Sequence, residues 1–381
     1  MKRLKQTDYP VIALTHPGMK GKNNEDSFGV ASFSQGWFGA RPILLAVLSD
    51  GIGGHRAGEV ASELAVEQIS RTVQNSDGRN PLVVLREAVQ AASQVIRDQA
   101  AQSSEQAGMG ATCACVWIVG DQLYTATVGD SRLYLLREGR IQRLSTDHTW
   151  IQEALERNLL QPEQVNGHPN AHVIRRYLGS PNPPDVDFRQ RLKEGDDDDS
   201  AQANQGSRLR VGDLLLLTSD GLTDLVSDEE IRAAYSARAP EAAGRELIDL
   251  ANARGGHDNI TLLAVQVPPS PRARRALPVR ARSVGLGCGA VLATALLALG
   301  LAAGWWWLGR PGILTAALTP TPSEMVPLAT GTLGAPSAAT ATPGPTLTLS
   351  AFRTATATRV VSLPLDSGPT LTPWPTNTPV K

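Results

Sequence analysis

The sequence predicts an α+β fold with a largely antiparallel sheet over residues 9–268. Three observations support this. Apolar runs of strand length mix with helical periods, two helical periods follow the first long apolar run, and several strands then come in succession through tight links. Because tight links join antiparallel strands, whereas parallel strands need long crossovers, the succession favours an antiparallel sheet.

The individual strands and helices follow from the spacing of apolar residues. Strand-like runs cover residues 28–34, 43–49, 111–119, 122–128, 132–137, 214–219 and 259–267, and helical periods cover residues 57–75, 81–102, 228–236 and 241–253. The link Arg137–Arg140 predicts a hairpin between two strand runs. Cys113 and Cys115 alternate along one run, so we expect both to face the same side of a buried strand.

Two of the apolar runs end in the same three residues. Residues 43–51 read ILLAVLSDG and residues 214–221 read LLLLTSDG. Continuous apolar runs of this kind are typical of buried strands, so Asp50 and Asp220 would both lie where a core strand emerges. If the strands are neighbours, the two carboxylates meet and repel, and a proton, a basic side chain or a metal ion must compensate.

Other acidic residues occupy similar positions at strand ends or in glycine-flanked turns. A single such residue is typical of an Asx-turn or a cap. Carboxylates that cluster without Cys or His fit a hard divalent cation, Mg²⁺ or Mn²⁺, and Gly51 could add its carbonyl oxygen. Two metals bridged by one aspartate would generate hydroxide and position it for attack on phosphorus. The acidic residues are Glu25, Asp26, Asp50, Asp130, Asp220 and Asp258.

Composition narrows the function classes. The 381 residues contain 36 Lys and Arg against 37 Asp and Glu, so a net charge of −1 gives no indication of nucleic-acid binding. Three cysteines without zinc-site spacing form no disulfide framework, which fits a reducing compartment. Residues 1–20 contain no apolar core of signal-peptide length, so we expect the N-terminal part to stay in the cytoplasm.

The rest of the chain divides by composition. Residues 149–207 carry weaker patterns, and their acidic stretch 194–207 is interpreted as a solvated, flexible loop. Residues 269–283 form a basic linker. Residues 284–308 are uncharged and long enough to span a bilayer, and the arginines before them predict a cytoplasmic N-terminal side. Residues 309–381, rich in Thr, Pro and Ala, are expected to be a disordered tail outside the cell.

Residues 9–268 resemble the metal-dependent serine/threonine protein phosphatases of type 2C, the PPM family, in a bacterial form. The resemblance rests on an ordered set of motifs rather than on any one of them. These are NNEDS at 23–27, SDGIGGHRAGEVAS at 49–62, MGAT at 109–112, VGDSRLYLLREG at 128–139, DHT at 147–149, YLGS at 177–180, GDLLLLTSDGLTD at 212–224 and GGHDNITLLAV at 255–265.

The resemblance implies a four-layer α-β-β-α sandwich, in which two antiparallel sheets are flanked by helix pairs and the metals lie between the sheets. It implies Mn²⁺ or Mg²⁺ as cofactor, two ions with a third held more weakly. Asp50 is the implied bridging ligand and Gly51 gives its carbonyl oxygen. Glu25 and Asp26 contribute from the turn before the first long strand.

The remaining implied ligands come from later motifs. Asp220 and Asp258 complete the first metal, and Asp130 resembles the ligand of the third ion, shared with Asp220. Asn259 is expected to orient the turn around Asp258. Residues 149–207 resemble the family's mobile flap beside the cleft, where substrate selectivity tends to lie.

The chain departs from the family pattern at two positions. Many members carry a phosphate-binding arginine where this chain has Gly21, so Lys20 or Lys22 could attract phosphate instead, as a point charge without the planar fork. Some members have a histidine where this chain has Ile52, and whether His55 replaces it stays open. We count Asp50, Asp220, Lys20 and Lys22 as candidate catalytic residues.

The expected function is hydrolysis of phosphoserine and phosphothreonine in proteins by a metal-bridging hydroxide, in opposition to serine/threonine kinases. We expect a cytoplasmic catalytic domain of residues 1–268, held at the plasma membrane by one helix, with phosphoproteins and a membrane serine/threonine kinase as partners and no nucleic acid. A non-catalytic sensing or scaffold module of the same fold is one alternative, although none of the expected carboxylates is missing. A small-phosphoester hydrolase is another.

Overall fold

The computed structural model describes residues 1–4, 7–21, 23–34, 42–53, 56–165, 167–268 and 358–362. The strands are β1 (Lys2–Arg3), β2 (Val11–His16), β3 (Ser27–Ser34), β4 (Pro42–Ser49), β5 (Gly51–Ile52), β6 (Gly110–Ala111), β7 (Cys113–Val119), β8 (Gln122–Val128), β9 (Arg132–Arg137), β10 (Arg140–Arg143), β11 (Ser207–Arg208), β12 (Leu214–Thr218), β13 (Ile260–Gln266) and β14 (Thr358–Ser362). The α-helices are α1 (Arg56–Asn75), α2 (Pro81–Gln102), α3 (Trp150–Glu156), α4 (Asp198–Ala203), α5 (Asp220–Thr223), α6 (Asp228–Ala237) and α7 (Pro240–Ala253).

Within the described residues, the strands form two six-stranded sheets and a short pair, β5 with β6. The first sheet has the order β1-β3-β4-β7-β8-β11, and the second has the order β10-β9-β12-β13-β2-β14. Neighbouring strands are antiparallel in both sheets, except that β14 pairs with β2 in parallel. The predicted α+β fold with antiparallel sheets is confirmed.

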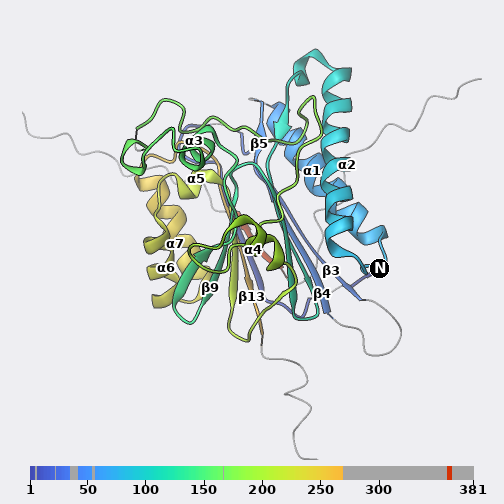
Figure 1. Ribbon diagram of the computed structural model, residues 1–381, viewed down its shortest axis with the longest axis vertical. Helices are drawn as coiled ribbons and strands as arrows, with labels where there is room; N and C mark the ends of the chain where they lie inside the picture. Colours follow the sequence, from blue (N-terminus) through green and yellow to red (C-terminus); the bar gives the residue numbers. More distant parts are fainter. Residues whose placement is uncertain are drawn as a thin grey trace, which may run out of the picture. The chain divides into compact units, whose positions relative to one another are not determined.

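Alternate side chains of the central strands enter different cores, because successive residues of a strand face opposite sides of its sheet. On β4, Ile43, Leu45 and Val47 pack with α1 and α2, whereas Leu44, Ala46 and Leu48 pack against the second sheet. A third core lies between the second sheet and helices α6 and α7. Figure 1 shows these layers, with α1 and α2 on one side of the strands and α6 and α7 on the other.

Two local predictions about strands are confirmed. Cys113 and Cys115 both lie in the core beneath α1 and α2, and both side chains are buried. The Arg137–Arg140 link is a two-residue hairpin turn between β9 and β10, in which Glu138 and Gly139 have φ values of 53° and 75°. Positive φ at both central residues is typical of a type I′ turn, whose backbone twist matches the right-handed twist of the flanking strands.

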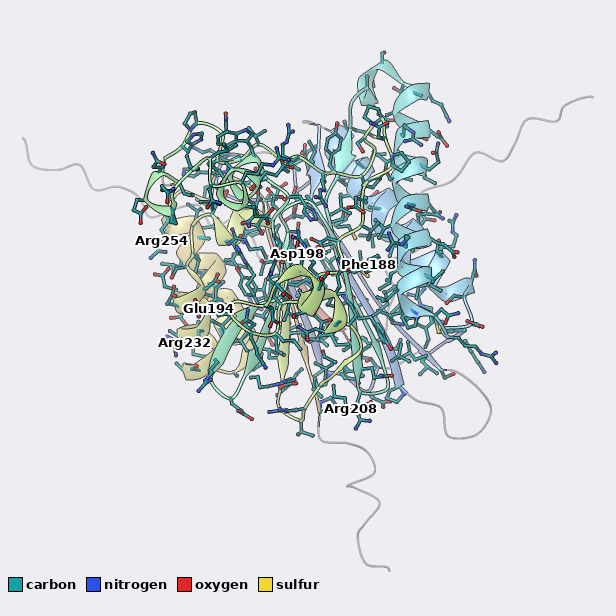
Figure 2. The ribbon with its side chains drawn as sticks, in the orientation of Figure 1. Phe188, Glu194, Asp198, Arg208, Arg232 and Arg254 are labelled. Carbon is teal, nitrogen blue, oxygen red and sulfur yellow. The ribbon has the colours of Figure 1, made fainter. Side chains whose placement is uncertain are left out.

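The acidic stretch 194–207 is not simply a flexible loop, and that prediction was wrong. Asp197 caps the N-terminus of α4 by accepting the backbone N–H of Ser200 at 2.8 Å. The Asp196 carboxylate accepts the backbone N–H groups of Leu192 and Lys193 and the side-chain amide of Asn204. Figure 2 labels Asp198 on this short helix. Asp196 and Asp197 therefore build structure here, because one oxygen of each accepts N–H donors.

The C-terminal predictions fall mostly outside the described residues. The predicted span 284–308 is among the residues whose placement is not described, as are the linker 269–283 and most of the tail. Among the helices of the described part, none is long and apolar enough to cross a bilayer. Thr358–Ser362 of the tail is described as β14, which pairs with Val11–Thr15 of β2.

Candidate metal centre

The ends of β4 and β12 bring Asp50 and Asp220 together. Their carboxyl groups lie within hydrogen-bond reach of each other. Burial, followed by the charges of neighbouring aspartates, raises the pKa of Asp50 well above its usual value. Burial and the charges of Asp224 and Asp258 raise the pKa of Asp220 to about 6. The two Ser-Asp-Gly segments thus meet, although β4 and β12 belong to different sheets and are not paired neighbours.

The turn before β3 is held from the start of β13 by Asn259. The Oδ1 atom of Asn259 accepts the backbone N–H of Glu25 at 2.7 Å, and its Nδ2 donates to the carbonyl oxygens of Pro17 and Asn23 at 3.1 Å each. Its backbone N–H donates to Asp258 Oδ1 at 2.9 Å. Asn259 therefore orients the turn around Asp258 as expected, and it also fixes the turn that carries Glu25, which was not predicted.

Asp26 comes from the same turn and lies directly before β3. Its Oδ2 accepts the hydroxyl of Ser219 at 2.8 Å. Burial raises the pKa of Asp26 to about 8. The hydrogen bonds of Thr261 and Ser219 oppose this rise, and the charges of Asp220 and Asp258 add to it. Asp26 is thus electrostatically part of the same group as Asp220.

Gly58, in the first turn of α1, leaves room for two further oxygen atoms. A Cβ on Gly58 would lie 2.5 Å from Glu25 Oε2 and 2.8 Å from the carbonyl oxygen of Gly51. Both separations are well inside normal contact distance, so only glycine lets these two oxygens approach the same point. The positive end of α1 also favours the Glu25 carboxylate there.

Asp130 lies in the turn between β8 and β9, and His148 holds that turn. The backbone N–H of Gly129 donates to His148 Nδ1 at 3.0 Å, and the backbone N–H of His148 donates to the Gly129 carbonyl oxygen at 2.9 Å. The other ring nitrogen of His148 lies 3.1 Å from Asp187 Oδ2. Burial and the charges of Asp220 and Asp147 raise the pKa of Asp130 well above its usual value.

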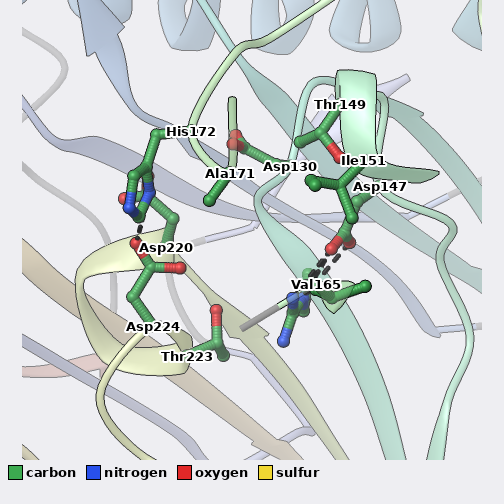
Figure 3. A pocket seen from close by; sticks show the side chains of 11 residues that line it. Asp130, Asp147, Thr149, Ile151, Val165, Ala171, His172, Asp220, Thr223 and Asp224 are labelled. Carbon is green, nitrogen blue, oxygen red and sulfur yellow. Dashed lines mark hydrogen bonds and ion pairs between the residues drawn. The ribbon is translucent and has the colours of Figure 1, made fainter. Parts of the chain in front are cut away.

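Asp130 and Asp220 line a cavity of 170 Å³ (Figure 3). Part of its wall comes from the predicted flap, namely Thr149, Ile151, Val165, Ala171 and His172. The flap residues therefore border the carboxylate group.

Two side-chain contacts in the cavity wall were not predicted from the sequence. The Arg132 guanidinium donates to Asp147 through Nε and Nη2, at 3.0 and 2.8 Å. His172 Nδ1 lies 3.0 Å from Asp224 Oδ2, and Figure 3 shows these two side chains facing each other. Asp224 follows Asp220 by four residues, and this spacing places both on one helical face. The spacing could therefore have predicted that Asp224 lies beside Asp220. The sequence offers no comparable signal for His172.

The remaining predicted residues are exposed or lie outside the described part. Asp258 is exposed and acts on Asp26 and Asp220 through its charge. Lys20 is also exposed. Gly21 has φ of +66°, a backbone conformation that favours glycine, and a Cβ there would meet nothing within 4 Å. Lys22 and His55 are outside the described residues.

The chemistry of the donors fits a divalent cation. Asp26 Oδ1, Asp130 Oδ1 and Asp220 Oδ1 are shielded from solvent and have no hydrogen-bond partner in the described part of the chain. Buried carboxylate oxygens of this kind are costly without a compensating charge, and a set made only of oxygens suits Mg²⁺ or Mn²⁺. The described side chains include no group of three or more Asp, Glu, His or Cys already arranged to enclose an ion. The donor atoms are of the kind that binds a divalent cation, but they enclose its position only in part.

Comparison with known proteins gives a consistent family. The model of the protein phosphatase 2C family matches residues 22–158. The serine/threonine protein phosphatase PstP of Mycobacterium tuberculosis is 34% identical over 256 residues, which are 67% of this chain and 44% of PstP. The match thus spans less than half the length of PstP. Protein phosphatase PhpP of Streptococcus pneumoniae is 32% identical over 262 residues, which are 68% of this chain and 97% of PhpP.

Solved structures agree with the sequence matches. The catalytic domain of PstP in complex with two manganese ions superposes with a TM-score of 0.54 and 33% identity, over 68% of this chain and 99% of that domain. A serine/threonine phosphatase of S. agalactiae gives a TM-score of 0.59 and 30% identity, over 68% of this chain and 99% of that protein.

Proposed function

Because the chain belongs to the protein phosphatase 2C family, we propose that it is a metal-dependent phosphatase acting on phosphoserine and phosphothreonine in proteins. The observation that carries the proposal is the meeting of Asp50 and Asp220 at the ends of two buried strands, beside oxygens of Asp26 and Asp130 that have no hydrogen-bond partner in the part of the chain that the structure describes. Burying like charges together costs free energy, so a structure that does so indicates a cationic occupant.

The ligand roles proposed here are those that the family resemblance implies. Asp50 would bridge two Mn²⁺ or Mg²⁺ ions, with the Gly51 carbonyl oxygen and Glu25 on the side of Gly58. Asp26 would add a ligand from the same turn as Glu25. The remaining roles fall to Asp220 and Asp258 at the first ion and to Asp130 at a weaker third ion, shared with Asp220. When bound, such ions acidify water and neutralise charge on phosphoryl oxygens.

The protein's own groups position and shield the reacting phosphate. The cavity beside Asp130 and Asp220 offers space for a phosphorylated side chain, and flap residues border it. Arg132 lines the same cavity, but Asp147 engages its guanidinium through two nitrogens, so Arg132 is not available as a phosphate clamp. Lys20 is exposed and can draw phosphate as a point charge.

A phosphatase assay on the full chain tests this proposal directly. We expect it to dephosphorylate phosphothreonine peptides with Mn²⁺ or Mg²⁺ and to lose this activity in chelator, and we expect Asp220→Asn to abolish it. Undiminished activity in chelator, or in the variant, would refute the proposal. A parallel assay with a small aryl phosphate separates the alternatives. Preference for the aryl phosphate would indicate a small-phosphoester hydrolase, and inactivity on both despite metal binding would indicate a sensing or scaffold module.

We further propose that residues 284–308 tether the enzyme to the plasma membrane, with the catalytic domain in the cytoplasm and the tail outside. The support is the uncharged run of bilayer-spanning length and the five arginines in residues 272–282 before it. Tethering raises the effective concentration of the phosphatase near membrane partners. A membrane serine/threonine kinase, whose products this activity would reverse, is the partner class that fits.

A further inference from the structure

The serines of the two Ser-Asp-Gly segments make different contacts. Ser49 and Ser219 are both fully buried. The Ser49 hydroxyl donates to a backbone group, the carbonyl oxygen of Thr112, at 2.7 Å. The Ser219 hydroxyl instead donates to the carboxylate of Asp26 at 2.8 Å, although the two residues are 193 positions apart in the chain. Of these two serines, Ser219 is thus the one that touches a candidate ligand.

The backbone of the second sheet fixes the direction of the Ser219 hydroxyl. The backbone N–H of Thr261, at the start of β13, donates to Ser219 Oγ at 2.9 Å. The single hydroxyl proton then has two acceptors in reach, Asp26 Oδ2 at 2.8 Å and the Asn259 carbonyl oxygen at 3.3 Å. The bond to Asp26 is the shorter of the two and has the more favourable distance. Ser219 therefore points at Asp26 because β12 and β13 hold its oxygen in place.

This hydrogen bond links the two sheets at the candidate metal centre. Asp26 immediately precedes β3 of the first sheet, whereas Ser219 immediately follows β12 of the second sheet. The bond occupies Oδ2, and Oδ1 of Asp26 is buried without a hydrogen-bond partner among the described residues. One oxygen of the carboxylate is thus anchored, and the other stays free to bind.

We propose that Ser219 is a positioning residue that holds Asp26 through Oδ2 so that Oδ1 faces a divalent cation. This inference rests on the proposed function, since it presumes that Asp26 is a metal ligand. Partners that orient a ligand in this way commonly affect metal affinity by about 10- to 100-fold when removed. Ser219 does not itself touch substrate or metal in this scheme.

The test is a double-mutant cycle read by Mn²⁺ calorimetry on the full chain. The four proteins are the wild type, Ser219→Ala, Asp26→Asn and the double variant. We expect Ser219→Ala to weaken Mn²⁺ binding by about 10- to 100-fold. We expect no further loss when it is added to Asp26→Asn, because the two residues act as one unit. Equal losses from Ser219→Ala in both backgrounds would overturn the inference.

Matched variants separate positioning from general damage to the core. Ser219→Thr keeps the hydroxyl and should retain Mn²⁺ affinity, and Ser219→Cys keeps the volume with a weaker donor and should lose affinity even if Ser219→Ala does not fold. Thr218→Val removes a neighbouring buried hydroxyl that has no partner among the described residues, and it should bind Mn²⁺ as the wild type does. If Thr218→Val weakens binding as much as Ser219→Cys does, the inference fails.

The same experiment distinguishes this inference from the proposed function. A wild type that binds no Mn²⁺ would contradict both. A wild type that binds Mn²⁺, together with a Ser219→Ala variant that binds it equally well, would contradict the role of Ser219 and leave the phosphatase assignment standing.

Discussion

Asp50 lies at the end of a buried strand, within hydrogen-bond reach of Asp220 and near Asp26 and Asp130. Each of these charges disfavours the others, so the folded state gives up stability at this point. Sites that sacrifice stability for function are common, since selection maintains activity above a stability threshold. A cation recovers the loss by neutralising the carboxylates. Removing one carboxylate should therefore affect stability and activity in opposite directions.

Asp50→Asn should be more stable than the wild type in chelator, by on the order of 1 kcal/mol at neutral pH. Mn²⁺ should stabilise the wild type and leave the variant almost unchanged. Activity on a phosphothreonine peptide should fall by on the order of 10²- to 10³-fold. Urea unfolding with and without Mn²⁺ measures the first two effects. A variant that Mn²⁺ stabilises as much as the wild type would contradict the assigned ligand.

Gly21→Arg examines the departure at the family's arginine position. Its φ of +66° makes any side chain unfavourable there, at about 1–2 kcal/mol, although the space around it is open. Gly21→Ala carries the same backbone cost without a guanidinium and is the matched control. If the arginine reaches substrate phosphate, KM for a phosphopeptide should fall in Gly21→Arg relative to Gly21→Ala. Equal KM values would show that the position is too far from the phosphate.

Asp187 should make the free energy of unfolding depend on pH. Burial disfavours its charge, but hydrogen bonds from His148 and Arg189 outweigh burial and lower the pKa of Asp187 below its usual value. A lowered folded pKa means that this stability is present above the unfolded pKa, about 3.9, and is lost as pH falls through the folded value.

Asp187→Asn should accordingly be less stable than the wild type at pH 7, by about 3 kcal/mol, because it removes the carboxylate that contacts buried His148 and one of those that Arg189 bonds. The difference in free energy of unfolding should shrink as pH falls below about 4. Urea unfolding at pH 7, 4 and 3 measures it. A difference that stays constant down to pH 3 would mean that the Asp187 charge is not the source.

At the scale of elements, apolar periodicity predicted the strands and helices whose formation depends on buried faces. The runs around β4 and β12 are strands because both faces of each sheet are covered, and α1, α2, α6 and α7 show their buried faces in the sequence. Strand β2 was missed, although Val11, Ala13 and Leu14 are core residues.

The missed parts depend on contacts that periodicity does not report. Helix α4 exists because Asp196 and Asp197 find particular N–H groups, and composition alone predicted a loop. The motifs named the acidic residues that meet, but they did not reveal that Ser219 holds Asp26 or that Asn259 holds the turn of Glu25. Such bonds join residues roughly 190 to 240 positions apart, and only the folded topology brings these residues together.

The junction of α1 with β5 yields a prediction at this scale. Gly58→Ala places a Cβ where Glu25 Oε2 and the Gly51 carbonyl oxygen approach, so the helix start must move away from the strand. We expect Mn²⁺ stoichiometry in calorimetry to drop by one ion, with activity reduced on the order of 10²-fold. Gly244→Ala in α7 is the control, since it too is tightly packed, against Leu14. Equal loss of Mn²⁺ in both variants would contradict a specific role of Gly58 in letting Glu25 and the Gly51 carbonyl oxygen bind the ion.

At the scale of the whole molecule, two arrangements of the tail exclude each other. Strand β14 pairs with β2, with Arg359 opposite Ile12, which requires the tail and the catalytic domain on one side of a membrane. The proposed tether instead places residues 309–381 outside the cell. Under the proposed topology, protease added to intact cells should trim the tail and spare residues 1–268. An Ile12→Cys and Arg359→Cys pair that cross-links in intact cells, with a protected tail, would reverse this conclusion.

The most direct measurement for the metal centre is anomalous diffraction at the manganese edge from crystals of the chain grown with Mn²⁺. Two strong peaks are expected between the ends of β4 and β12, both within ligand distance of Asp50, with Glu25 and the Gly51 carbonyl oxygen at one and Asp220 and Asp258 at the other. Well-ordered crystals with no peak there, or with manganese bound only elsewhere, would contradict a metal-dependent phosphatase centre built on these carboxylates.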